Sequence, residues 1–294
     1  MIATPQTLMS DTFLPVALCL FSALTVALAN FVVKRGGDVL TARMVLSITS
    51  ALCMAPVALF VPLPGPTLWS AIAVAIGAHW IYQFCMIRAL HRGELSLVFP
   101  VMRGLAPMMT AIIAVFALNE TPTPLGWFGL VLATAALFVF ALPQGESLSQ
   151  RKINRSALIW AVLTAVGVGL YSVTDAYGVR LAPVMLTFIV WLFMLDWIGT
   201  TAVTLWTRRG QLRVRVRSQL VAGIVGGVSS VLSYGSALWA FSMTSAATVT
   251  ALRETSVVFG AILGALFLKE SFGWTRMIAA GVLATGLLLL EVRL

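Results

Sequence analysis

Four charged side chains lie inside long apolar stretches of this sequence. Arg103 opens "RGLAPMMTAIIAVFALNE", the adjacent Arg253 and Glu254 open "RETSVVFGAILGALFLKE", and Asp175 lies in "SVTDAYGVRLAP". An arginine in the hydrocarbon core costs at least about 2.5 kcal/mol on insertion scales, so it normally faces protein or a wet cavity. These arginines could hold a substrate carboxylate. Asp175 and Glu254 could carry a titratable proton or form ion pairs.

Two interpretations of the arginines remain open. In the first, Glu254 forms an ion pair with Arg103 that holds two parts of the chain together, because intramembrane charges usually pair. In the second, Arg103 and Arg253 flank a cavity and bind a substrate. Both interpretations can be correct if substrate binding changes which charged groups pair with each other. A further carboxylate, Asp196, is interpreted as a packing or pairing residue.

Uncharged polar side chains also recur at helical spacing. His79, Tyr82 and Gln83 are i, i+3 and i+4 neighbours in "HWIYQF", so they share one face of a helix. Three polar side chains on one intramembrane face favour a polar cavity over an isolated hydrogen bond. The other candidate substrate-binding residues are Asn30, Tyr171, Tyr234 and Trp239.

The elements that carry these residues are predicted to cross a lipid bilayer. Of 294 residues, 60% are hydrophobic and 10% are charged, with a mean hydropathy of +0.99, whereas soluble domains carry about 25% charged residues. A bilayer-spanning helix needs about 20 apolar residues. Ten such spans are predicted, near 12–33, 39–62, 67–90, 94–117, 124–142, 156–178, 182–206, 217–242, 246–268 and 272–291.

The second half of the chain repeats the first. Residues 103–120 align without a gap with 253–270, so Arg103 matches Arg253 and the closing glutamates also match. Five spans per half force the halves to insert in opposite senses, as in many secondary transporters. The predicted fold class is an all-α polytopic membrane protein with two inverted five-helix repeats around a central cavity. Its parts are a first repeat, a polar linker and a second repeat, at 1–142, 143–155 and 156–294.

Two prolines distinguish the first copy from the second. Pro100 and Pro107 lie on the face of Arg103, where the second half has Thr250 and Val257. Each proline removes a backbone donor and bends a helix. They are therefore hinge candidates, or they fix a static kink, and the two copies should differ in bend.

The basic residues set orientation and argue against nucleic acid as a partner. The net charge is +9, but fifteen Lys and Arg residues fall in loops on one side of the predicted membrane and only two on the other. This bias predicts that both termini are extracytoplasmic, in the inner (plasma) membrane. The three cysteines lie in apolar runs without metal-ligand spacing, so no metal and no cofactor is predicted.

The chain resembles the drug/metabolite transporter superfamily, in particular its ten-helix proteins with two EamA-type repeats. The resemblance rests on "RGELSLVFPVMRG" at 92–104, "SVTDAYGVRLAP" at 172–183 and "ALRETSVVFGAILGALFLKE" at 251–270, and it covers nearly the whole chain. It implies a basket of helices whose cavity is lined by spans one, three, four, six, eight and nine, and an exporter of amino acids or similar metabolites. It also implies cytoplasmic termini, opposite to the side that the basic loops predict.

We therefore expect a secondary transporter that exports a small metabolite, a neutral or aromatic amino acid, by alternating access. Arg103 or Arg253 would attract the substrate carboxylate, and Tyr82, Tyr171 and Tyr234 would contact its side chain. The other expected partners are the bilayer, protons as a coupling ion if transport is driven, and at most a weak homodimer. A multidrug or organic-cation exporter and a nucleotide-sugar or lipid translocator remain alternatives. A membrane-embedded enzyme fits less well, because no DDxxD-like, HxxxD, HExxH or GxSxG motif occurs.

Overall fold

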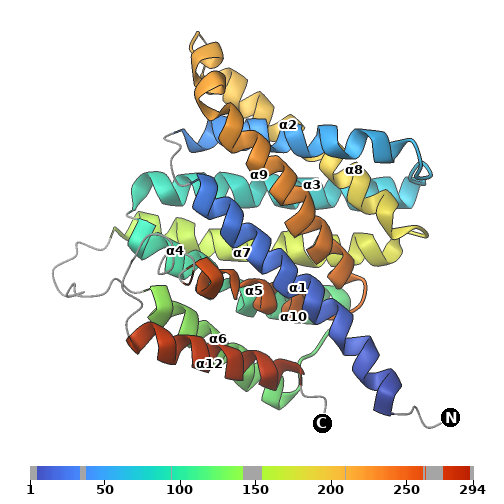
Figure 1. Ribbon diagram of the computed structural model, residues 1–294, viewed down its shortest axis with the longest axis vertical. Coiled ribbons are helices and arrows are strands. Elements are labelled where there is room, and N and C mark those ends of the chain that lie inside the picture. The colour runs from blue at the N-terminus through green and yellow to red at the C-terminus, as the bar shows by residue number, and fades with distance from the viewer. Residues whose placement is uncertain are drawn as a thin grey trace.

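The computed structural model describes residues 5–33, 38–93, 95–141, 154–208, 210–260, 262 and 274–291. Within these ranges every regular element is a helix (Figure 1). Most of the predicted linker, 143–153, lies outside the described residues. The helices are α1 Pro5–Val33, α2 Val39–Ala58, α3 Pro66–Arg92, α4 Leu95–Gly104, α5 Ala106–Leu118, α6 Pro124–Ala141, α7 Arg155–Leu181, α8 Met185–Thr207, α9 Leu212–Phe241, α10 Ala246–Arg253 and α12 Trp274–Glu291.

Nine of the predicted spans correspond to a helix or, for the fourth span, to the pair α4 and α5. The ninth, 246–268, begins with α10, and its residues 261 and 263–268 lie outside the described part of the chain. Six segments of the described chain are long and apolar enough to cross a membrane, and α1, α6 and α12 contain shorter apolar stretches. The predicted all-helical, multi-pass membrane fold is therefore confirmed.

Short polar signals set the ends of several helices. The Asn154 side chain accepts hydrogen bonds from the N–H groups of Ser156 and Ala157 at the start of α7, at 3.0 and 3.3 Å. Ser245 caps α10 in the same way through the N–H of Thr248, at 3.1 Å. Such caps satisfy N–H groups that have no partner within the helix.

The two halves of the chain interlock. Helix α3 of the first half packs along α7 of the second, and α9 of the second half packs along α1 of the first (Figure 1). These are the same two positions of the repeat with the halves exchanged, which is the pairing expected of two repeats related by a two-fold axis. The last helices of the repeats, α6 and α12, pack against each other at one edge of the bundle.

Glycines allow α6 and α12 to approach closely. A Cβ atom on Gly129 would lie 2.5 Å from the carbonyl oxygen of Gly286, and a Cβ atom on Gly286 would lie 2.7 Å from that of Gly129. No side chain fits at either distance. Small residues at such crossings allow close van der Waals packing, which is a main source of association between helices in a bilayer.

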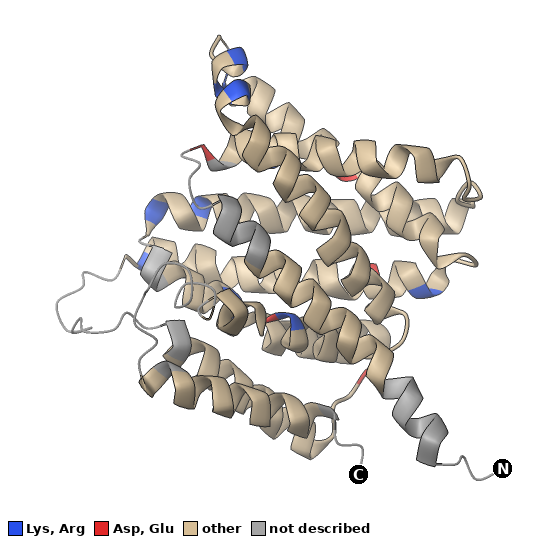
Figure 2. Ribbon diagram, viewed as in Figure 1, with Lys and Arg blue, Asp and Glu red and all other residues tan. Residues whose placement is uncertain are grey.

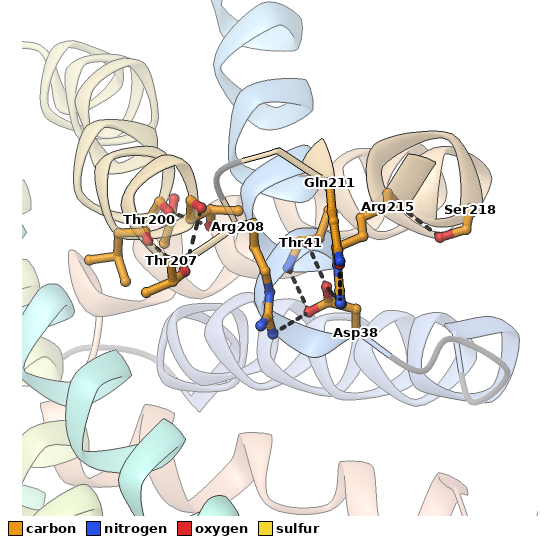
Figure 3. A network of polar contacts seen from close by, with 10 residues as sticks. Asp38, Thr41, Thr200, Thr207, Arg208, Gln211, Arg215 and Ser218 are labelled. Atoms are coloured by element: carbon orange, nitrogen blue, oxygen red, sulfur yellow. Dashed lines mark hydrogen bonds and ion pairs between the residues drawn. The ribbon is translucent and has the colours of Figure 1, made fainter. Parts of the chain in front are cut away.

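One end of the bundle carries most of the described basic residues (Figure 2). There Asp38, which caps α2, joins the turn between α8 and α9. It accepts a hydrogen bond from the Thr41 hydroxyl at 2.8 Å, and its oxygens lie 3.2 Å from Arg208 Nη2 and 2.9 Å from Arg215 Nη1 (Figure 3). Burial by itself would raise the pKa of Asp38, but the hydrogen bonds from Thr41, Arg215 and Arg208 lower it from 3.8 to about 2.

A second polar network ties three segments together at the opposite end. Arg180, near the end of α7, pairs with Glu120 after α5 at 2.5 Å. It also donates to the carbonyl oxygens of Phe241 and Thr244, both at 2.8 Å. The second carboxylate oxygen of Glu120 accepts from the N–H of Ala246 at 2.8 Å. The ends of α5, α7 and α9 are therefore joined at this face.

Candidate functional site

A cavity of about 290 Å³ lies between the interlocked halves. Its wall draws on α1, α3, α4, α7, α9 and α10, the six positions that the family resemblance implies, and also on α2 and α8. A somewhat larger depression, of about 350 Å³, lies among the loops around residues 119–123 and 244–248. That depression is at the end of the bundle, so the central cavity is the better candidate for a site near mid-membrane.

The cavity brings together most of the predicted substrate-binding residues. Trp239 is not among them: it lies nine residues beyond Ser230, on the opposite face of α9, and is 45% exposed. Asn30 lies in α1, but its side chain is outside the described part of the structure. The predicted residues that line the cavity are His79, Tyr82, Gln83, Arg103, Tyr171, Tyr234 and Arg253.

Arg103 pairs with Glu254 across the two halves. Its Nη1 lies 3.1 Å from Glu254 Oε1. Glu254 is only 1% exposed, whereas the Arg103 side chain is 28% exposed and faces the cavity. This is the ion pair of the first interpretation, and it leaves part of the Arg103 guanidinium accessible.

Arg253 differs from Arg103 because no described carboxylate pairs with it. Its Nε donates to Ser22 Oγ at 3.1 Å, and its guanidinium lies 4.9 Å from the centre of the Tyr234 ring. Ser22 and Ser233 hydroxyls lie 3.1 Å apart and hold each other in place. A serine and an aromatic face orient the cation without neutralising it, so the charge of Arg253 is available to the cavity.

His79 and the tyrosines form an aromatic cluster over a buried carboxylate. Asp175 is fully buried; His79 Nε2 lies 2.9 Å from its Oδ2, and the Tyr234 hydroxyl donates to the same oxygen. The His79 ring stacks on Tyr171 at 4.6 Å, and Tyr82 meets Tyr171 edge-on at 5.1 Å. Asp175 therefore lies behind the cavity wall and acts on the cavity only through His79 and Tyr234.

Comparison with known proteins identifies the fold and its two copies. The model of the EamA-like transporter family matches residues 12–142 and again 155–292. The chain belongs to the EamA-like transporter family. A solved structure titled "Crystal structure of protein" superposes on it with a TM-score of 0.73, at 16% identity, over 96% of this chain and 97% of that one. At that identity the likeness shows the fold alone. No curated protein matches the sequence.

Two charged residues of this EamA-like transporter lie in the cavity wall although the sequence did not single them out for binding. Arg43, one of the fifteen basic residues that the sequence assigned to loops on one side of the membrane, lies in the second turn of α2, and Asp196 lies in the middle of α8. The available signal was their position inside predicted spans, where a charged residue is a candidate functional residue by default.

The regular backbone hydrogen bonding of the α-helix is interrupted at the same place in both repeats, within predicted spans four and nine. Leu105 separates α4 from α5, just before Pro107, which has no N–H to donate. In the second repeat α10 ends at Arg253, and the N–H groups of Glu254 and Thr255 bond to carbonyls three residues back, at 3.1 and 3.2 Å. Such 3₁₀ bonding in mid-helix often marks a hinge. Both copies thus share the interruption although only the first has prolines. The expected difference in bend between the copies stays a prediction.

Proposed function

We propose that this EamA-like transporter exports small zwitterionic metabolites, and that neutral or aromatic amino acids are its substrates. The observation that carries the proposal is Arg253, a cation in the wall of the central cavity with no carboxylate partner among the described residues. Such a cation suits a substrate carboxylate. Arg103 adds positive charge nearby while its pairing with Glu254 remains intact.

The size and lining of the cavity support amino acids over the alternative substrates. A volume of about 290 Å³ lies at the lower limit of small-molecule pockets, about 300–1,000 Å³, and is small for a nucleotide sugar or a lipid. Among the described residues, three arginines line it against one carboxylate, which disfavours organic cations. Tyr82, Tyr171 and Tyr234 supply aromatic faces for an apolar or aromatic side chain.

Alternating access accounts for the use of two interlocked repeats. Rocking of inverted repeats about a central site opens the site to one side at a time. The Asp38 and Glu120 networks lie at opposite ends of the bundle and are the contacts such a motion would strain. The basic end would face the cytoplasm, which puts both termini outside. If export is coupled to protons, His79 and Asp175 form the candidate pair.

Transport by purified protein in liposomes tests the proposal. Liposomes loaded with amino acids, nucleosides or organic cations are scored for counterflow of the labelled compound. We expect counterflow of neutral or aromatic amino acids, reduced about 10- to 100-fold by Arg253→Gln, because hydrogen bonds to charged groups are worth about 1.5–3 kcal/mol. Transport of organic cations with indifference to amino acids would indicate a multidrug exporter instead.

A further inference from the structure

Asp196 is the carboxylate of the cavity wall whose charge the described residues leave unpaired. It lies on α8 next to Leu192 and Phe193, which line the same wall. Its Oδ1 accepts a hydrogen bond from Gln83 Nε2 at 3.4 Å, and its main-chain oxygen accepts from Trp80 Nε1 at 3.3 Å. No described Lys, Arg or His nitrogen lies within the 4.0 Å of an ion pair with it.

The free oxygen of Asp196 is open to the cavity, unlike those of the other intramembrane carboxylates. Asp175 Oδ1 and Glu254 Oε2 are sealed in the protein and lack a partner. Asp196 Oδ2 makes no hydrogen bond with the described residues and is not among the sealed atoms. An intramembrane carboxylate that faces a cavity and has no cation is a functional-site candidate by default.

The positive and negative groups of the cavity come from different walls. Asp196 belongs to α8 and Arg253 to α10, and these two helices are not among the pairs that pack closely against each other. Arg43 also lines the cavity and is near enough to Asp196 to interact electrostatically with it, but it contacts Met86 Sδ at 3.8 Å and does not reach ion-pair distance of Asp196. Asp196 and Arg253 therefore line the same cavity without an ion-pair partner among the described residues.

We propose that Asp196 binds the ammonium group of the substrate while Arg253 binds its carboxylate. This inference rests on the proposed function and assigns one cavity residue to each charged end of its zwitterionic substrate. An ammonium group offers three N–H donors and a carboxylate only acceptors, so each end of the substrate matches one wall. Gln83 positions Asp196 by bonding its other oxygen.

Three related ligands distinguish the contact of Asp196 with the ammonium group from that of Arg253 with the carboxylate. Phenylalanine carries both charges, 3-phenylpropanoate only the carboxylate, and phenethylamine only the ammonium group. Binding to purified protein in detergent is measured by calorimetry for wild type, Asp196→Asn, Arg253→Gln and the control Asp38→Asn. Asp38 has the same chemistry but lies at the N-terminal end of α2, outside the cavity lining, so its variant controls for any loss of stability.

We expect wild-type protein to bind phenylalanine at least tenfold more tightly than either analogue. Asp196→Asn should weaken phenylalanine and phenethylamine about 10- to 100-fold and leave 3-phenylpropanoate within about threefold. Arg253→Gln should do the reverse, weakening phenylalanine and 3-phenylpropanoate. Asp38→Asn should preserve the wild-type order of the three ligands.

Other results would overturn the inference. Equal weakening of all three ligands by Asp196→Asn would mean a structural role, and an unchanged phenylalanine affinity would mean no contact with the substrate. If Asp196→Asn does not yield folded protein, the affinities of wild-type protein decide. Wild-type protein that binds 3-phenylpropanoate as tightly as phenylalanine would have no site for the ammonium group, and the inference would be wrong. If the protein transports carboxylates equally well with and without an ammonium group, this inference is wrong, but the proposed role of Arg253 in binding the carboxylate still holds. Wild-type protein that binds none of the three contradicts the proposed function, and this inference with it.

Discussion

Arg103 and Glu254 show why a pair of charges is tolerated in the middle of this protein. Each belongs to a different repeat, and their contact at 3.1 Å compensates a glutamate that is 1% exposed. Removing one partner of a buried pair leaves an uncompensated charge, which is far worse than removing both. The pair therefore holds the halves together chiefly because separating it would leave a buried charge uncompensated, at a large cost in free energy.

A double-mutant cycle tests this role. Arg103→Gln should lower the free energy of unfolding by about 3–5 kcal/mol, and the double variant with Glu254→Gln should recover most of that loss. Denaturant unfolding in detergent micelles, followed by tryptophan fluorescence, measures each value. A loss below about 1 kcal/mol for Arg103→Gln, or additive losses in the double variant, would contradict a compensating pair.

Asp38 gives a pH-dependent prediction at the end of the bundle. Its pKa is about 2 in the folded protein against an ordinary 3.8, so its ionised form stabilises the fold by about 2 kcal/mol. Because the folded pKa is the lower one, this stabilisation is nearly complete above pH about 4 and is lost as the pH falls through about 2. Asp38→Asn should be less stable than wild type at pH 6, and the difference should shrink to a few tenths of a kcal/mol near pH 2. A difference that is the same at both pH values would show that ionisation is not its source.

The sequence predicted individual polar residues better than their partners. Periodicity assigns a side chain to a face of its own helix, which is why His79, Tyr82 and Gln83 were expected to line a cavity. It does not say which helices meet, so the contact of Arg253 with Ser22 could not be predicted. The surroundings of Asp196 were out of reach for the same reason, because the lack of an ion-pair partner among the described residues becomes visible only when α8 is packed against its neighbours.

At the scale of helices, the crossing of α6 and α12 brings the two backbones close together. Gly129→Ala would force its Cβ to within 2.5 Å of the Gly286 carbonyl oxygen, so the helices must separate, at a cost of about 1–3 kcal/mol. Gly281→Ala, on α12 itself, meets nothing within 4 Å and should be neutral or stabilising. Unfolding of both variants in micelles distinguishes them. Equal stability would mean that the close crossing does not contribute to the fold.

Hydropathy located the nine spans that correspond to described helices, because the bilayer imposes a minimum apolar length on each. Only one of the two interruptions, those within spans four and nine, could be predicted from the sequence. Pro107 marks the first, but the second depends on 3₁₀ bonds from Glu254 and Thr255, for which the sequence carries no proline signal. Pro100 and Pro107 are interpreted either as a functional hinge or as a static kink. Span nine is interrupted at the same place without prolines, which favours packing as the cause of the interruption there.

At the scale of the whole molecule, the two copies enclose one chamber by exchanging helices. Because α3 packs on α7 and α1 on α9, neither half closes the cavity by itself, and the walls with Arg253 and Asp196 belong to different elements of the second repeat. The alignment of 103–120 with 253–270 predicted the duplication, but the interlocking required coordinates. The central claim is that this chamber is water-accessible and carries the substrate.

A single cysteine in the chamber tests that claim most directly. Ser230 lines the cavity, so Ser230→Cys is introduced after Cys19, Cys53 and Cys85 are replaced by alanine, and reconstituted protein is treated with a bulky, membrane-impermeant thiol reagent. The account predicts that Cys at this position is modified from the aqueous phase, that phenylalanine slows the modification, and that modified protein no longer transports. A thiol that the reagent does not reach, or one whose modification leaves transport and phenylalanine binding unchanged, would contradict it.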